Sequence, residues 1–277
     1  MTGWSNIGWQ ARFGLLLLAA LGLMALAAPL IAPGDPLALS GPPLLRPFLD
    51  AAHPLGTDRL GRDVLAGIVH GSRTTLMVAL FSAAAALMFG SLIGTLSGFL
   101  GGIVDLALMR LTEAFQTVPA FLLALAAISM SGPGIPTLVF AISLGNWTQA
   151  ARVTRAEVLS LRERDFVAAA RVLGMRPLEI AFREILPNAF GPLVSLAAIS
   201  VASAILIEAA LSFLGFGDPN RVTWGSMIAE GRTVLRAAPY LSVVPGIALV
   251  ATVLGVHFAG RGLALRERVS RRERVAQ

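Results

Sequence analysis

The chain has 277 residues, of which 56% are hydrophobic and 14% charged, with a mean hydropathy of +0.75 and a formal net charge of +6. This composition lies outside the range of soluble domains and predicts a membrane protein. The absence of cysteine excludes disulfides and cysteine-ligated metals. All 22 basic residues are arginine, which excludes ATP hydrolysis by a P-loop with its lysine.

Six apolar segments predict membrane-spanning helices, each of which needs about 20 residues. They are residues 13–32, 76–99, 111–131, 134–150, 189–214 and 240–260. The fourth is the shortest and is interrupted by Asn146 and Trp147. The sequence therefore predicts an all-α membrane protein in which an N-terminal anchor helix precedes a five-helix unit.

The first apolar segment has a second interpretation, a cleaved signal peptide, because Ala25-Leu26-Ala27 resembles a cleavage site. Its apolar run is longer than the roughly 7–15 residues of a signal peptide, and only Arg12 precedes it. An uncleaved span is therefore the favoured prediction.

The placement of arginine predicts the orientation. With the N-terminus in the cytoplasm, residues 1–12, 100–110, 151–188 and 261–277 are cytoplasmic and hold 15 arginines, against 7 on the other side. This asymmetry follows the positive-inside rule and places both termini in the cytoplasm. It also explains the pI of about 11.4 without a nucleic-acid site.

A loop rich in proline and glycine, residues 33–75, separates the first span from the other five. Asp58 and Asp63 in this loop could ligate a metal, but each has an arginine nearby, Arg59 or Arg62. Local ion pairs are therefore expected there. The three histidines are too scattered in sequence to form a metal site.

The second span carries a ladder of small residues, Gly90, Gly94 and Gly98, which allows two helices to approach closely. The partner helix could belong to this chain or to another subunit, and the spacing leaves both possibilities open.

The segment from Asp165 to Asn188 is a charged insertion between two apolar spans. Helical spacing puts one apolar stripe on its first helix, formed by Phe166, Ala169, Ala170 and Leu173. Gly174 follows at the point where a helix favours a residue that tolerates the left-handed conformation.

Pro177 suits the first turn of a second helix, with Leu178, Phe182 and Ile185 on one face. Leu186-Pro187-Asn188 is expected to break that helix before the next span. A water-facing helical pair between membrane spans is typical of a docking device for a soluble partner.

The fifth span contains Glu208, the one acidic residue clearly inside an expected span. Such residues usually face a cavity, a pore or a partner, which would place Glu208 on a translocation pathway. Its position near the outer surface also allows a simple ion pair with Arg221 or Arg232, and both interpretations stay open.

The segment that follows, residues 217–240, is expected to form a turn and a short interfacial helix. Trp224 and Tyr240 fit the aromatic residues found at membrane interfaces. This outward-facing segment could line an entrance.

Four motifs in this order resemble the permease subunits of bacterial ABC importers, and most closely the C-type subunit of dipeptide, oligopeptide and nickel permeases. Residues 165–188 resemble the EAA loop of that family in Ala169-Ala170, Gly174 and the ending Ile185-Leu186-Pro187. The resemblance covers nearly the whole chain. The other three motifs are HPLGTDRLGRDV at 53–64, GGIVDLALMRLTEAF at 101–115, and ALSFLGFG with WGSMI at 210–217 and 224–228.

Four positions depart from the pattern of that family. Ala168 stands where many wider-family members have the glutamate of the EAA loop, which weakens any glutamate-based contact with an ATPase. Glu113 and Arg261 replace aspartates, and Val118 replaces a phenylalanine before proline. The change at Arg261 puts the C-terminal helix cap in doubt.

The resemblance implies a non-catalytic subunit of the bacterial inner membrane that forms half of a translocation pathway with a homologous permease subunit. Two ATPase subunits would bind on the cytoplasmic side and hold the ATP and magnesium, while this chain binds no cofactor, no metal and no nucleic acid. An external binding protein would deliver the solute. That solute would be a short peptide or a related compound such as a nickel chelate or glutathione.

The resemblance also implies a division of the chain. Residues 1–72 would form the anchor and a periplasmic loop, residues 73–264 the permease domain with its coupling loop 151–188, and residues 265–277 a basic cytoplasmic tail. The residues expected to couple to an ATPase are Ala169, Ala170, Leu173, Gly174, Met175, Arg176, Pro177, Leu186 and Pro187.

Two other classes of function fit the sequence less well. A secondary transporter driven by an ion gradient would show several intramembrane charges and duplicated halves, and only Glu208 qualifies. An intramembrane enzyme would carry a motif such as HExxH or a serine with a histidine partner inside a span, and the sequence has neither.

Overall fold

The computed structural model describes residues 8–275, with side chains described as far as residue 262. This part of the chain is helical and forms no β-strand beyond one isolated bridge, Thr57 to Asp63. The elements are α1 (Trp9–Leu26), α2 (Ala28–Ile31), α3 (Val64–Leu100), α4 (Gly102–Gln116), α5 (Ala120–Ser131), α6 (Ile135–Leu161), α7 (Asp165–Val172), α8 (Pro177–Glu179), the π-helix η1 (Ile180–Ile185), α9 (Leu186–Asn188), α10 (Phe190–Phe213), α11 (Trp224–Arg232) and α12 (Tyr240–Val275).

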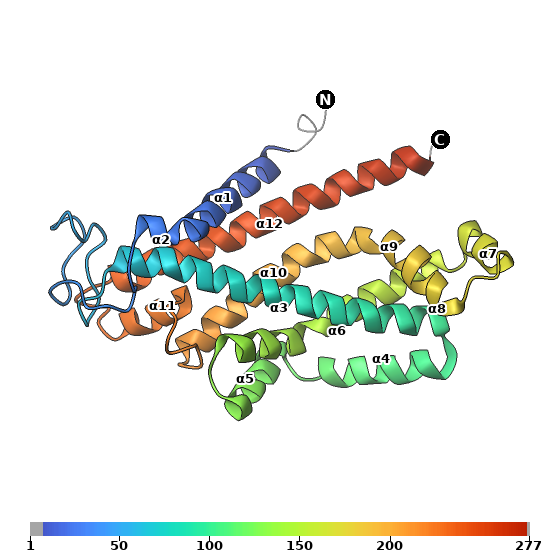
Figure 1. The fold of residues 1–277 in the computed structure, drawn as a ribbon, viewed down its shortest axis with the longest axis horizontal. Coiled ribbons are helices and arrows are strands. Elements are labelled where there is room, and N and C mark those ends of the chain that lie inside the picture. The colour runs from blue at the N-terminus through green and yellow to red at the C-terminus, as the bar shows by residue number, and fades with distance from the viewer. Residues whose placement is uncertain (1–7, 276–277) are drawn as a thin grey trace.

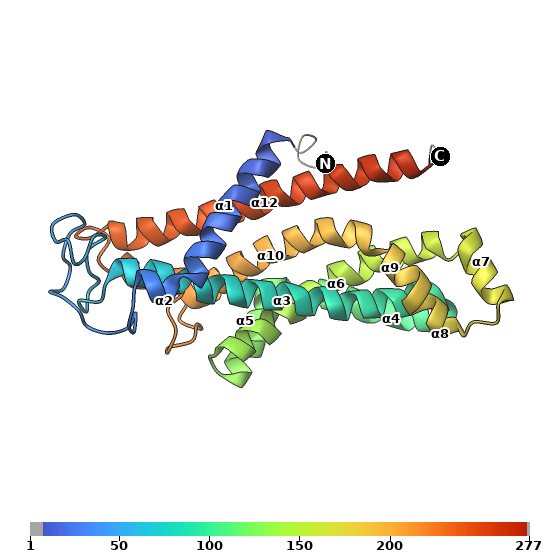
Figure 2. The same cartoon turned by 45° about the horizontal axis from the view of Figure 1, so that its top comes forward.

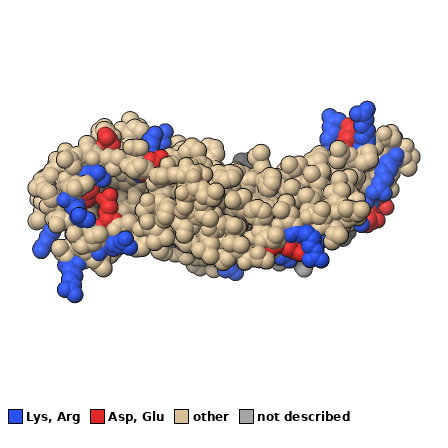
Figure 3. Space-filling view, turned by 90° about the horizontal axis from the view of Figure 1, so that it is seen from below, with Lys and Arg blue, Asp and Glu red and all other residues tan. Residues whose placement is uncertain are grey.

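The long helices form an elongated bundle with two distinct ends (Figures 1 and 2). Residues 33–63 and α11 lie together at one end, which we call the loop end, and α7 and α8 lie at the opposite end, which we call the coupling end. On the face in Figure 3, charged side chains gather towards the two ends and leave a broad band of other residues between them. This distribution suits a protein whose middle lies in lipid.

Among the described residues, four helices are long and apolar enough to cross a membrane, namely α1, α3, α10 and α12. The helices α4 and α5 pass the same test only as a pair, bent by 85°. The prediction of one continuous helix over residues 111–131 is therefore wrong. The chain bends at Val118-Pro119 because proline has no amide to donate and disfavours helical geometry in the residue before it.

The predicted fourth span, residues 134–150, is the first part of α6, which continues to Leu161. Its second half carries Arg152, Arg155 and Glu157, and α6 as a whole is not among the apolar candidates. The count of six spans therefore stays a prediction. The predicted boundary between residues 72 and 73 falls inside α3, and the tail after residue 264 continues the backbone of α12.

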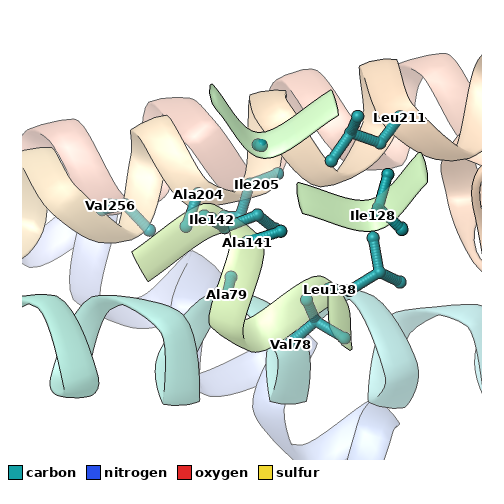
Figure 4. Packing of buried hydrophobic residues seen from close by; sticks show 11 residues of the cluster. Val78, Ala79, Ile128, Leu138, Ala141, Ile142, Ala204, Ile205, Leu211 and Val256 are labelled. Atoms are coloured by element: carbon teal, nitrogen blue, oxygen red, sulfur yellow. The ribbon is translucent and has the colours of Figure 1, made fainter. Parts of the chain in front are cut away.

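The largest hydrophobic core lies where five helices meet (Figure 4). Val78 and Ala79 come from α3, Ile128 comes from α5, and Ile205 comes from α10. The 85° bend between α4 and α5 turns α5 so that its residues Ala124 and Ile128 contribute to this core. The remaining members are Leu138, Ala141, Ile142, Ala204, Leu211 and Val256.

The glycine ladder of α3 packs against α6 of the same chain. A Cβ at Gly90 would lie 2.3 Å from the carbonyl oxygen of Trp147, and a Cβ at Gly94 would lie 2.3 Å from that of Ala151. Gly98 is slightly looser, at 3.0 Å from the carbonyl oxygen of Arg155. The ladder therefore serves intramolecular packing, which decides between the two possibilities left open by the spacing.

Two glycines give the motif at 53–64 its shape at the loop end. Gly56 and Gly61 have φ of +78° and +83°, where a side chain is strained. A Cβ at either position would also come within 2.2 Å of a carbonyl oxygen, that of Leu45 or Gly41. The motif is thus a compact turn around which residues 40–47 are wrapped.

The aspartates of the same motif bond to the backbone. Asp58 accepts hydrogen bonds from the amides of Leu60 and Arg62, both at 2.8 Å, and Asp63 caps the start of α3. Only one of the expected ion pairs forms, with Arg62 Nε 4.0 Å from Asp58 Oδ2. Arg59 instead donates to the hydroxyl of Thr233 at 2.8 Å, which ties the loop to the end of α11.

Candidate coupling segment

The helix α7 ends in a Schellman turn centred on Gly174. The amide of Gly174 donates to the carbonyl of Arg171 at 3.0 Å, and the amide of Met175 donates to that of Ala170 at 3.2 Å. Gly174 has φ of +77°, and a Cβ built there would meet no atom within 4 Å. The predicted left-handed cap is confirmed, and the position faces away from the rest of the chain.

The inner face of the segment is held by a small core. Val167 and Ala170 of α7 pack with Ile180 and Ile185 of η1 and with Val158 of α6. Phe99 from the end of α3 and Met175 cover this cluster. The segment therefore rests on the ends of α3 and α6.

The outer face is apolar and uncovered. Of the predicted stripe, only Ala170 is buried, while Phe166, Ala169 and Leu173 are exposed. Leu173 is 81% exposed and its neighbour Val172 is 88% exposed. The stripe points outwards because Val167, one residue further along, takes the inward position. Within the described chain, nothing covers these side chains.

The second helix begins as predicted. Arg176 is extended and precedes Pro177 in the first turn of α8. Both residues are exposed, and so is Leu178. The chain therefore presents Leu173, Gly174, Arg176 and Pro177 together at the coupling end.

The predicted break falls slightly later than expected: residues 177–188 are helical, a turn at Ala189 interrupts the helix, and α10 runs from there in a different direction (Figures 1 and 2). The π-turn before Pro187, with the amide of Leu186 bonded to the carbonyl of Ala181, widens the helix where the proline ring needs room. The coupling segment is thus joined to α10 through the single turn residue Ala189.

Glu208 lies near the far end of α10 and is completely buried. Its Oε1 accepts a hydrogen bond of 2.7 Å from the hydroxyl of Ser212, and its Oε2 has no hydrogen-bond partner. No ion pair of Glu208 exists among the described residues, and the guanidinium of Arg232 instead lies 4.6 Å above the ring of Phe213. The ion-pair interpretation is therefore wrong. The carboxyl is also covered from solute in this conformation.

The two aromatic residues that were predicted at the membrane interface bond to the backbone of their own chain. Trp224 is fully buried, and its Nε1 donates to the carbonyl of Ile68 at 3.0 Å. The hydroxyl of Tyr240 lies 2.7 Å from the carbonyl oxygen of Leu45 and 2.8 Å from that of Thr57. Both residues hold the loop end together.

Among the described residues, no cluster of three or more His, Cys, Asp and Glu side chains is placed to hold a metal. What the sequence reasoning missed is a set of arginines at the end of α6 and directly after it, which bond back to α3 and α4. Arg155 is the central one, paired with Asp105. The sequence did hold one signal for this ion pair, the acidic residue Asp105 shortly after the glycine pair at 101–102.

This fold, an elongated helical bundle with an uncovered apolar segment at one end, defines the class of a multi-pass membrane subunit built to work with partners. The family model described as "Binding-protein-dependent transport system inner membrane component" matches residues 86–269. The chain belongs to this family.

Similar proteins support the assignment over nearly the whole length. The dipeptide transport system permease protein DppC of Alkalihalophilus pseudofirmus is 35% identical, covering 91% of this chain and 83% of that protein. The di/tripeptide transport system permease protein DppC of Pseudomonas aeruginosa is 38% identical, covering 90% and 84%. A probable peptide ABC transporter permease protein of Sinorhizobium fredii, y4tQ, is 42% identical, covering 87% and 82%.

Among solved structures, the MetNI methionine ABC transporter in an inward-facing conformation has a similar fold, with a TM-score of 0.59 and 20% identity. The match covers 73% of this chain and 96% of that chain. The protein is therefore a non-catalytic permease subunit of an ABC importer in the bacterial inner membrane. Its family implies ATPase subunits, which use ATP and magnesium, and a substrate-binding protein as partners.

Proposed function

We propose that this chain forms half of the translocation pathway of a peptide importer. The support is the set of relatives whose names specify dipeptide, di/tripeptide or peptide transport, at 35–42% identity over about nine-tenths of the chain. Nothing in the fold or the comparisons favours a transporter driven by an ion gradient. A homologous second permease subunit completes the pathway.

The coupling segment docks an ATPase through its outer face. The carrying observation is the uncovered apolar cap at Val172, Leu173 and Gly174, and only Ala189 separates the segment that bears this cap from α10. ATP-driven closure of the ATPases would push on this cap, and the segment would pass that movement to α10 across the turn at Ala189. Of the residues expected to couple, Ala169, Leu173, Gly174, Arg176 and Pro177 are exposed for this contact, and Ala170 and Met175 support it from the inner core. Leu186 and Pro187 complete the set on the way to α10.

The second permease subunit packs on an apolar groove between α3, α6 and α10. Phe81, Met88, Phe140 and Phe190 line this groove, and Phe182 of η1 closes it towards the coupling end. A surface of this kind needs a protein or lipid cover within a membrane. A partner subunit there would form the pathway at the same helices that the coupling segment moves.

The division of the chain follows from these roles. Residues 1–72 supply an anchor and a periplasmic loop, residues 73–264 the permease domain with its coupling loop 151–188, and the basic tail 265–277 stays in the cytoplasm. The coupling end faces the cytoplasm because most arginines lie there.

The experiment is co-purification in detergent of the tagged chain with the ATPase subunits co-expressed from its own operon, for the wild type and Gly174→Asp. The wild type should retain the ATPases and the variant should lose them, because a charged side chain appears on the outer face at φ of +77°. Gly215→Asp is the matched control, because Gly215 has φ of +90° and equally open surroundings but lies after α10 at the loop end. It should retain the ATPases.

Retention of the ATPases by Gly174→Asp, together with normal peptide uptake, would contradict the docking assignment. Uptake of labelled dipeptide, nickel chelate and glutathione by cells carrying the whole operon then tests the solute. Uptake of a nickel chelate or glutathione without any peptide uptake would contradict the peptide proposal.

A further inference from the structure

A tight reversal at the coupling end brings α4 back along α3 and α6. Gly101 and Gly102 have φ of +67° and +55°, a pair of left-handed residues that only glycine adopts readily. The chain turns from α3 to α4 in these two residues, and Asp105 follows in the first turn of α4. The reversal therefore fixes where the carboxylate of Asp105 points.

That carboxylate joins three helices. Arg155 of α6 donates to both oxygens of Asp105, from Nε to Oδ1 and from a terminal guanidinium nitrogen to Oδ2, each at 2.6 Å. The hydroxyl of Ser97 on α3 also donates to Asp105 Oδ1. The Arg155 side chain is 32% exposed and the Asp105 side chain 20% exposed. A partly buried pair with this fork geometry resists rotation in a way that an exposed single contact does not.

Further contacts join the same helices on either side of the pair. Arg162 donates to the carbonyl of Gly98 at 3.0 Å, and Arg152 donates to the side-chain oxygen of Gln116 at 3.1 Å. The backbone of Gly94 lies against Ala151, one turn before Arg155. Two arginines of α6, and Arg162 directly after that helix, therefore cross-link the ends of α3 and α6 and the length of α4.

The coupling segment is attached to this cross-linked base. Only residues 162–164 separate α6 from α7. The inner core of the segment packs on Val158 of α6 and Phe99 of α3, and both residues lie within three positions of a cross-linking residue. If α6 could bend or rotate here, a push on the outer cap would move only the end of α6 and would not reach the membrane helices.

We propose that the Asp105–Arg155 ion pair is a positioning clamp, which holds the ends of α3, α4 and α6 as one rigid base for the coupling segment. This inference rests on the proposed docking of an ATPase at the outer cap. The clamp does not touch the ATPase. Its role is to pass the movement of the segment to the membrane helices.

The test uses the full importer reconstituted in liposomes with its ATPases and binding protein, and measures ATP hydrolysed per dipeptide imported. Asp105→Asn and Arg155→Gln should keep the ATPases bound but raise this ratio at least about fivefold, the lower end of typical coupling energies. Glu113→Gln is the matched control, because Glu113 also lies on α4 and pairs with Arg110, but on the open surface. It should leave the ratio unchanged.

Two further variants distinguish a positioning role from a general loss of structure. Arg155→Lys keeps the charge but not the fork, and should give an intermediate ratio. The exchange of charges, Asp105→Arg with Arg155→Asp, should recover a ratio closer to that of the wild type than either single variant.

A wild-type ratio for Asp105→Asn would overturn the clamp, and so would loss of the bound ATPases, because the pair would then build the docking site. A charge exchange no better than the single variants would also overturn it. None of these results affects the proposed function, which is tested separately by ATPase binding and peptide uptake in Gly174→Asp and by the choice of solute.

Discussion

At Gly94 the carbonyl oxygen of Ala151 occupies the space in which any side chain would begin. The contact lies between α3 and α6. Any residue other than glycine at this position would hold the two helices further apart. The spacing of Gly90, Gly94 and Gly98 was sufficient to predict close packing. It could not identify the partner, because the ladder is the same whether the facing helix belongs to this chain or another.

We expect Gly94→Ala to force α3 and α6 apart, because its Cβ would lie 2.3 Å from the Ala151 oxygen. Overpacking of this kind costs about 1–3 kcal/mol, which thermal unfolding of the purified protein in detergent would show. Gly246→Ala in α12 is the control, since a Cβ there meets nothing within 4 Å. Equal unfolding temperatures for the two variants would show that the close approach does not limit stability.

Glu208 is a buried acid whose bonding is internal. Its hydrogen bond with Ser212 and its neighbours Thr75 and Thr223 place it where α10, α3 and the start of α11 meet. The sequence showed that the residue was unusual, but sequence position alone could not separate a pathway residue from one that fixes a helix junction.

We expect Glu208→Gln to import peptide at the wild-type rate, because the amide oxygen still accepts from Ser212. Glu208→Ala should lower the unfolding free energy by about 1–3 kcal/mol, since it leaves the Ser212 hydroxyl buried without its partner. Uptake and thermal unfolding are measured together. A Glu208→Gln protein that is stable but inactive would return Glu208 to the translocation pathway.

At the scale of elements, the sequence predicted long apolar helices well and predicted their ends poorly. The bend between α4 and α5 was hidden because apolar composition continues through Val118-Pro119, although the proline was visible. At Pro187 a π-turn lets the helix continue as far as Asn188, so the break expected at residues 186–188 falls at Ala189. The position of a proline therefore does not by itself fix the residue at which a helix ends.

The loop at residues 33–63 has no regular secondary structure, and a few hydrogen bonds hold it to α12 and to the end of α11. Tyr240, at the start of α12, contacts the carbonyl oxygens of Leu45 and Thr57. We expect Tyr240→Phe to lose about 1 kcal/mol of local stability, because the phenol contacts are lost while the ring remains. Hydrogen exchange of residues 40–60 should become faster, with no change in α7 or α10. Unchanged exchange in the loop would show that its glycine turns hold it without Tyr240.

At the scale of the whole molecule, the two ends of the bundle have different tasks. The loop end is fastened by backbone bonds and buried aromatic residues, whereas the coupling end leaves an apolar surface uncovered. For movement of the coupling segment to reach the loop end across the membrane, the two ends must lie on opposite sides of the membrane. The sequence predicted that orientation from arginine alone, and the separation of the two ends in Figure 1 supplies the geometry it requires.

The absence of cysteine makes this orientation directly measurable, because any introduced cysteine is the only thiol. Phe48 in the loop and Val172 in the coupling segment are 85% and 88% exposed, so each can be replaced without disturbing a core. In intact cells with a permeable outer membrane, an impermeant maleimide should label Phe48→Cys and not Val172→Cys. Labelling of Val172→Cys should appear only after the inner membrane is opened. The reverse pattern would place the outer cap on the side without ATP, where no ATPase could dock, and would contradict both the orientation and the coupling role of α7.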